Sequence, residues 1–432
     1  MKYIITVSIS LFILSTNLFA QYEGSVPRIT SGYGANGIHN VSVISFPSPL
    51  WSAKEIVIFY PSDIIEPVPV IFYSHGFRGN DTTYVRELYN HIASRGYALV
   101  YSPYKTYVTT NEERYNTLFE GFKKAIQDYP NILDSSRCGF IGHSFGGGAT
   151  PEMAQRAINN GWGENGKFLF MMAPWYSLEI SQEELENFPI DANLIVQVYD
   201  NDATNDHRIG IDIFNNIRIP DSLKDFIVVS ADTIDSFIYE AGHSLPSQYS
   251  PSGIFDAYDY YAVFRLLDAL ADFTFTGNQD AKNVALGNGS FEQIDMGPFR
   301  PLYVTDNPQP QYPQDKYKWP CDTLTNPRRD YCTDISDITN NTFSINSFNL
   351  SQNYPNPFNP NTTINFSIPV NGMVSLTIYN TLGEKVDKLI NDEILIGNYS
   401  VKWNASNLPS GIYLYQLRTK GFVQTKKLLL LK

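Results

Sequence analysis

Ser144 is the residue of this sequence whose surroundings best suit nucleophilic chemistry. It lies at the centre of Gly142-His-Ser-Phe-Gly146, between an apolar run and a segment of helical composition. A serine hydroxyl becomes an effective nucleophile when it is held exposed beside a base, and a sharp turn from a strand into a helix exposes it. Glycine on both sides leaves space across such a turn. The pentapeptide therefore predicts a nucleophile elbow, and a turn that only joins two elements is the alternative.

His243 is the expected base, because it lies in the small-residue loop Glu240–Pro246 between the last predicted strand and the last predicted helix. The remaining histidines lie before the sheet, in a polar helix, after an acidic loop or in motifs with other roles: His39, His75, His91, His143 and His207. For the acid, Asp200 and Asp202 both follow an apolar strand, where carboxylates point toward the catalytic edge of an α/β sheet. We select Asp202, because the chain must turn before a carboxylate can reach a histidine. Asp200 and, further along, Asp206 stay open.

A serine mechanism also needs two backbone N–H groups where negative charge develops on the carbonyl oxygen. Phe145, directly after the nucleophile, is expected to provide one of them. Phe77, in the His75-Gly-Phe77 loop after an apolar strand, is expected to provide the other. His75 itself is expected to brace this loop. Water releases the acyl group in such a mechanism, so we expect neither a metal nor a cofactor.

The elements that would position these residues alternate between Val26 and Phe273. Short apolar runs follow amphipathic stretches, which predicts an α/β fold with a mostly parallel sheet flanked by helices. Strands are predicted at Val41–Phe46, Glu55–Tyr60, Val70–Ser74, Ala98–Ser102, Arg137–Gly142, Phe168–Met172, Asn193–Tyr199 and Phe226–Ser230. Helices are predicted at Tyr84–Ser94, Glu112–Tyr129, Gly146–Asn159, Arg208–Ile217 and Phe255–Phe273.

The chain order of the candidates, Ser144, then Asp202, then His243, resembles that of the α/β-hydrolases. Between Val68 and Asp272 the chain is similar to the cutinase-like polyester hydrolases and their lipase relatives. The similarity rests on the oxyanion loop, the elbow, a strand-end tryptophan and the acid and base loops: His75-Gly-Phe77, Gly142–Gly147, Ala173-Pro-Trp175, Asp200–Asp202 and Gly242–Pro246. It implies that Phe77 and Trp175 contact the acyl part of the substrate. For Trp175, an ordinary core aromatic is the alternative.

Two departures from that family concern the substrate. Its usual cysteine after the histidine loop is absent, and the Glu-rich segment Ser177–Pro189 is longer than a compact cutinase needs. We therefore expect a secreted serine carboxylic-ester hydrolase, for which simple esters are a safer expectation than aromatic polyesters. A peptidase or acyltransferase on the same scaffold is one alternative, and a non-catalytic surface adhesin or binding protein is another.

The C-terminal part of the chain has a different texture. Proline interrupts residues 276–345, which predicts a linker or an irregular wrap. Short alternating strands follow and predict a small β-sandwich over residues 346–432: Thr363–Ile368, Val374–Tyr379, Gly397–Trp403, Gly411–Arg418 and Gln424–Leu431. Three segments here closely resemble the sorting domain of the type IX secretion system: Leu350–Thr363, Val374–Gly383 and Leu408–Tyr415. The resemblance implies export across the outer membrane by that machinery, to the medium or the cell surface.

Residues 1–20 have the charged start, apolar middle and small final residue of a secretory signal peptide, which leaves 21–275 as the expected catalytic domain. No later segment is expected to anchor the chain in a membrane. The formal charge of −13 argues against a nucleic-acid partner. In an exported chain, the nearby Cys321 and Cys332 are expected to form a disulfide. Cys138 is expected to be a small buried apolar residue.

Overall fold

The computed structural model of the chain describes residues 21–248, 253–332, 349–350, 352–353, 355–368, 372–394 and 397–432. The predicted signal peptide, residues 1–20, and the end of the predicted linker, residues 333–345, lie outside the described residues. Within the described part, no helix combines the length and the apolar character that a membrane crossing requires.

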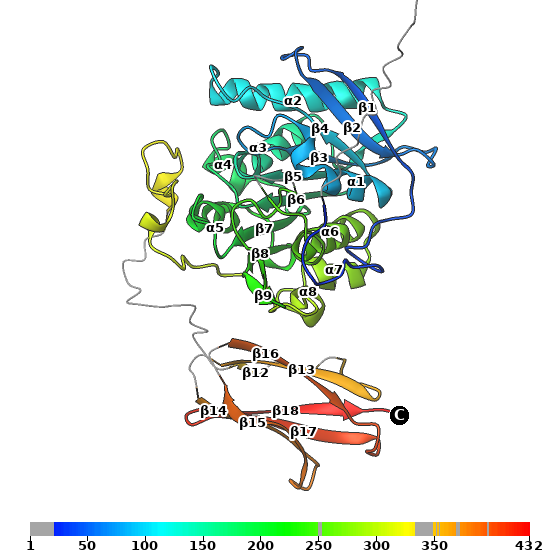
Figure 1. Ribbon diagram of the computed structural model, residues 1–432, viewed down its shortest axis with the longest axis vertical. Helices are drawn as coiled ribbons and strands as arrows, with labels where there is room; N and C mark the ends of the chain where they lie inside the picture. Colours follow the sequence, from blue (N-terminus) through cyan, green and yellow to red (C-terminus); the bar gives the residue numbers. More distant parts are fainter. Residues whose placement is uncertain are drawn as a thin grey trace, which may run out of the picture.

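A large mixed sheet with helices on both faces forms the centre of residues 21–332, here called the α/β body (Figure 1). In the described residues its strands run in the order β1-β2-β4-β3-β5-β6-β7-β8-β11. The six strands from β4 to β8 in this order pair in parallel, and β1, β2 and β11 join antiparallel at the two edges. The strands are β1 Val41–Pro47, β2 Glu55–Pro61, β3 Val68–Ser74, β4 Ala98–Tyr101, β5 Leu133–His143, β6 Lys167–Met172, β7 Asn193–Tyr199, β8 Lys224–Val229 and β11 Tyr303–Thr305.

Side chains alternate between the two faces of this sheet, as the period of a strand requires. In β3, for example, Ile71 and Tyr73 enter the core under α1, α6 and α7, whereas Val70 and Phe72 enter the core under α2, α3, α4 and α5. These helices are α1 Arg86–Ser94, α2 Asn111–Asp128, α3 Phe145–Asn159, α4 Gln182–Glu186, α5 His207–Asn216, α6 Arg265–Thr276 and α7 Gln279–Ala285, and α8 Phe291–Ile294 follows. All eight predicted strands and all five predicted helices have counterparts. The last predicted helix begins with a π-helical segment, Asp259–Phe264, before α6.

Residues 276–332 are a wrap and not a free linker. They contain α7, α8 and β11, and Met296, Phe299 and Leu302 are buried in the same core as α1 and α6. The sequence does not predict these elements, because prolines interrupt any periodic pattern and β11 has only three residues. A small hairpin, β9 Asp232–Ile234 and β10 Phe237–Tyr239, also escaped prediction.

The C-terminal residues form two antiparallel sheets, β12-β13-β16 and β15-β14-β17-β18, whose apolar side chains share one core. The predicted strands correspond to β13 Asn361–Ile368, β14 Gly372–Tyr379, β16 Gly397–Asn404, β17 Gly411–Arg418 and β18 Val423–Leu430. Two further strands were not predicted: β12 Asn349–Leu350 and β15 Lys385–Ile394. The largely exposed and charged sequence of β15 suits the sheet edge that it occupies.

Candidate active site

Ser144 lies on a strained turn between β5 and α3. Its backbone has φ 56° and ψ −118°, a conformation that non-glycine residues rarely adopt. A Cβ atom at Gly142 would lie 2.3 Å from the carbonyl oxygen of Gly146, and one at Gly146 would lie 1.8 Å from that of Ser74. Both positions therefore require glycine. The Ser144 N–H donates to Met172 O (3.0 Å), and the Ser144 carbonyl oxygen accepts the backbone N–H groups of Gly148 (3.0 Å) and Trp175 (2.8 Å).

The structure brings Ser144, His243 and Asp202 together. His243 Nε2 lies 3.0 Å from Ser144 Oγ, and His243 Nδ1 lies 2.8 Å from Asp202 Oδ2. The second oxygen of Asp202 accepts hydrogen bonds from the backbone N–H groups of Thr204 (2.6 Å) and Asn205 (3.2 Å). The carboxylate is 2% exposed and the imidazole 18%, so the acid is buried while the histidine reaches solvent. With a proton on Nδ1 shared with Asp202, Nε2 is free to accept the Ser144 proton.

Burial raises the pKa of the Asp202 carboxyl, but the hydrogen bond and charge of His243 and the Thr204 N–H outweigh it and leave the pKa below its usual value. Asp202 is therefore ionised at neutral pH. Among the described residues, His243 pairs with Asp202 and not with Asp200, the alternative acid. The Asp200 carboxylate accepts a hydrogen bond from Tyr312 Oη, and its carbonyl oxygen accepts one from Lys316 Nζ (2.7 Å).

Two further histidines hold the surrounding loops. Burial lowers the pKa of His143 to about 3, so it is neutral, and its Nε2 donates to the carbonyl oxygen of His243 (2.7 Å). Burial likewise lowers the pKa of His75 to about 3. Its Nδ1 lies 2.8 Å from Gly76 O, its Nε2 accepts the Tyr104 N–H (3.3 Å), and the two rings stack 4.0 Å apart. His75 thus occupies the bracing position expected for it.

The loop that carries Phe77 lies beside the elbow. A Cβ atom at Gly76 would be 3.5 Å from Ser144 Cβ, so the backbone that leads into Phe77 passes close to the nucleophile. The backbone N–H groups of Phe77 and Phe145 have no acceptor among the described residues. Both expected oxyanion donors are therefore unengaged and lie on the two segments that flank Ser144.

Aromatic rings surround the candidate nucleophile. Phe77 is 46% exposed and meets Tyr107 edge to face. Trp175 is only partly exposed, because its ring packs between Phe145 (5.7 Å) and Tyr176 (4.6 Å). Trp175 thus combines contact with the elbow with the packing of a core aromatic.

Two residues of the site's surroundings were missed in the sequence: Asn205, which contacts Ser144, and Trp319, which contacts Trp175. Asn205 is 2% exposed, and its Nδ2 lies 2.9 Å from Ala173 O and 3.5 Å from Ser144 Oγ. Trp319, from the proline-rich region, contacts Trp175 with ring centroids 5.6 Å apart. Neither residue belongs to a motif, and only the pairing of distant segments brings them here.

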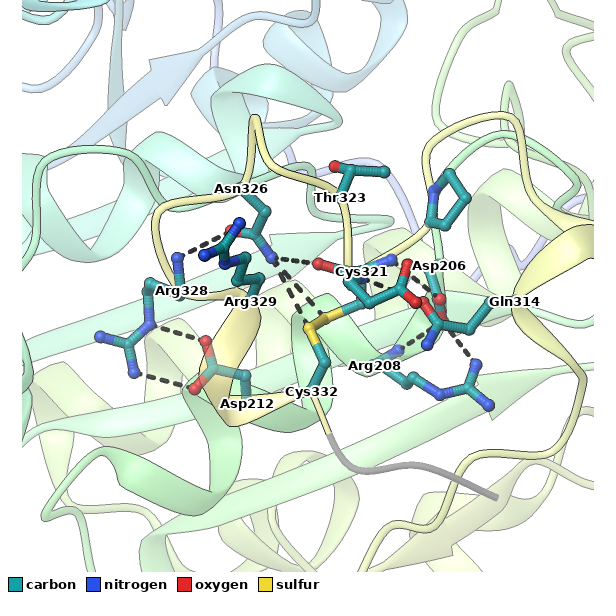
Figure 2. The surroundings of a disulfide bond; sticks show 12 residues. Asp206, Arg208, Asp212, Gln314, Cys321, Thr323, Asn326, Arg328, Arg329 and Cys332 are labelled. Atoms are coloured by element: carbon teal, nitrogen blue, oxygen red, sulfur yellow. Dashed lines mark hydrogen bonds and ion pairs between the residues drawn. A yellow bond between two sulfur atoms is a disulfide. The ribbon is translucent and has the colours of Figure 1, made fainter. Parts of the chain in front are cut away.

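The expected disulfide between Cys321 and Cys332 is present and lies beside α5 (Figure 2). Figure 2 also shows Arg328, whose guanidinium binds both carboxylate oxygens of Asp212 at 2.6 and 2.8 Å. Cys138 is free and buried, as expected.

Comparison with known proteins bears on the C-terminal part. The family model described as the secretion system C-terminal sorting domain matches residues 352–431. The resemblance noted in the sequence is thereby confirmed, and it supports interaction with the type IX secretion machinery. The protein is secreted, to the cell surface or to the outside. No curated protein matches the chain.

Proposed function

We propose that this protein is a secreted serine carboxylic-ester hydrolase. The observation that carries the proposal is the pair of contacts made by one imidazole, which lies 3.0 Å from Ser144 Oγ and 2.8 Å from the buried Asp202 carboxylate. The chain order of these residues, and the place of Ser144 on a strained strand-to-helix turn, also support an α/β-hydrolase fold for the α/β body.

In this mechanism Ser144 Oγ attacks the ester carbonyl carbon while His243 Nε2 takes its proton. Asp202 accepts the Nδ1 proton in a hydrogen bond and stabilises the imidazolium. The N–H groups of Phe77 and Phe145 bind the oxyanion. His243 then gives its proton to the leaving alcohol. A water molecule, deprotonated by the same imidazole, hydrolyses the acyl-enzyme and restores the Ser144 hydroxyl.

The proposed substrates are esters that meet the enzyme outside the cell. The exposed ring of Phe77 beside the elbow favours flat or apolar acyl groups. The similarity to cutinase-like polyester hydrolases adds aromatic polyesters to the substrates worth testing, after soluble esters. The esterase assignment rests on the geometry around Ser144. Assays with a panel of ester and peptide substrates would distinguish it from peptidase activity.

The test is hydrolysis of p-nitrophenyl butyrate by Ser144→Ala, with Ser45→Ala in the edge strand β1 as the matched control. We expect Ser144→Ala to lose activity to the background and to lose labelling by a fluorophosphonate probe, whereas Ser45→Ala keeps both. Activity retained by Ser144→Ala would exclude the mechanism. A wild-type protein that neither reacts with the probe nor cleaves esters would favour a binding protein with an inactive hydrolase scaffold.

A further inference from the structure

Residues 312–332, here called the strap, are hydrogen-bonded to the loop that carries Asp202. Lys318 N–H donates to Ala203 O (2.9 Å) and Trp319 N–H donates to Thr204 O (2.8 Å). In return, Asp206 N–H donates to Trp319 O (3.2 Å). These bonds include an isolated parallel β-bridge between Asn205 and Trp319, so a segment far along the chain pairs with the loop beside Ser144.

The bridge fixes the direction of the Trp319 side chain. Residues paired across a β-bridge project their side chains to the same side. The Asn205 side chain points to the elbow, since its Nδ2 lies 3.5 Å from Ser144 Oγ. Trp319 projects to that side as well, where its ring meets the ring of Trp175 edge to face, at 76° between the planes.

Trp319 is the more exposed ring of this pair. The Trp175 ring is packed against Phe145 and Tyr176, and its backbone N–H donates to Ser144 O, whereas Trp319 is 38% exposed. Because the acyl group becomes bonded to Ser144 Oγ, it must lie next to the elbow and to the neighbouring rings of Phe145 and Trp175. A flat acyl group there would gain contact with the exposed face of Trp319.

The strap is held by contacts on both sides of Trp319, which fix the position of its backbone. Before it, Lys316 Nζ binds Asp200 O (2.7 Å). After it, Tyr176 Oη binds Pro320 O (2.6 Å), and Cys321 N–H binds Asp206 Oδ2 (3.1 Å) within the disulfide-closed loop. A ring whose backbone is fixed loses little conformational entropy when it contacts a substrate.

We propose that Trp319 is a specificity-determining residue that forms an aromatic wall for flat acyl groups, with Trp175 as its support. The inference rests on the proposed ester hydrolase function and names its substrate class as esters of aromatic carboxylic acids. Loss of the aromatic contact together with its buried apolar area should cost about tenfold in kcat/KM on such esters.

The experiment compares p-nitrophenyl benzoate with p-nitrophenyl acetate for the wild type, Trp319→Ala and Trp319→Phe. Leu324→Ala, at an exposed position of the same strap, is the matched control. We expect Trp319→Ala to lose about tenfold in kcat/KM on the benzoate and less than about twofold on the acetate. Trp319→Phe should recover part of the benzoate activity, and Leu324→Ala should match the wild type on both esters.

Equal losses on both esters would overturn the inference, because they would show that Trp319 only supports the fold. Unchanged benzoate activity would overturn it as well. Fluorophosphonate labelling of Ser144 distinguishes failure of this inference from failure of the proposed function. A wild type that is not labelled and cleaves neither ester would contradict the hydrolase function itself. A Trp319→Ala variant that is labelled and still cleaves the acetate tests the aromatic wall alone.

Discussion

Asp202→Asn should remove nearly all activity while leaving the fold intact, and the reason lies in how the two carboxylate oxygens are used. Oδ1 accepts the N–H groups of Thr204 and Asn205, so the amide oxygen of an asparagine must take that place. The NH2 group then faces His243 Nδ1, where it can only donate. His243 must accept with Nδ1 and carry its proton on Nε2, which now points a hydrogen at Ser144 instead of a lone pair.

The expected loss is large because the wrong tautomer cannot take the serine proton. The same exchange in a serine protease triad lowers kcat by about 10⁴, which corresponds to about 5 kcal/mol in the activation barrier. Initial rates on p-nitrophenyl butyrate measure it, and the melting temperature checks the fold. Asp200→Asn is the matched control: an asparagine oxygen still accepts the Tyr312 hydroxyl, so we expect activity within about threefold of the wild type.

Two results would refute this reasoning. If Asp202→Asn kept more than about a tenth of wild-type activity, His243 would not depend on Asp202 for its tautomer. If Asp200→Asn lost as much as Asp202→Asn, the loss would reflect damage to the turn and not the orientation of His243.

Two further predictions concern stability. Burial raises the pKa of Asp225 to about 7, so the folded state holds this proton more tightly than the unfolded state and stability from this group falls as pH rises from about 4 to 7. Asp225→Asn should therefore raise the melting temperature at pH 8 relative to the wild type but not at pH 4, and the gain in the free energy of unfolding should not exceed about 4 kcal/mol. An equal change at both pH values would contradict this prediction. Replacing both Cys321 and Cys332 by serine opens a short loop closed over a separation of 11 residues, which should cost about 3 kcal/mol in thermal or denaturant unfolding. If the double variant unfolded at the same point as the wild type with its disulfide intact, the loop would be held by its hydrogen bonds alone, and wild type measured with a reductant should unfold like the double variant.

The central strands of the α/β body were predictable, because strands that are buried on both faces have continuous apolar sequences. β3 and β7 are buried at every position, and both were located to within two residues. β11 and β15 lack this signal. β11 has three residues among prolines, and β15 carries charged side chains at a sheet edge, so in both cases tertiary pairing determines the strand and local composition does not.

The candidate site divides in the same way. Ser144 lies in a local motif, and His243 and Asp202 follow from their places after particular strands, so the sequence was sufficient to bring them together as a prediction. Asn205 and Trp319 meet through a β-bridge between two loops with no periodic pattern. Contacts of this kind depend on the path of the proline-rich region, which composition alone describes only as irregular.

The choice between Asp200 and Asp202 was open in the sequence because both acids share one turn, and the structure gives each a separate contact. Asp202 faces His243, while Asp200 binds Tyr312 and Lys316 of the strap. The strap and the histidine are therefore both hydrogen-bonded to the same short segment. The strap and the proposed base thus contact adjacent residues of one turn, which is why the sequence alone could not assign the acid: only the separate contacts of the two carboxylates distinguish them.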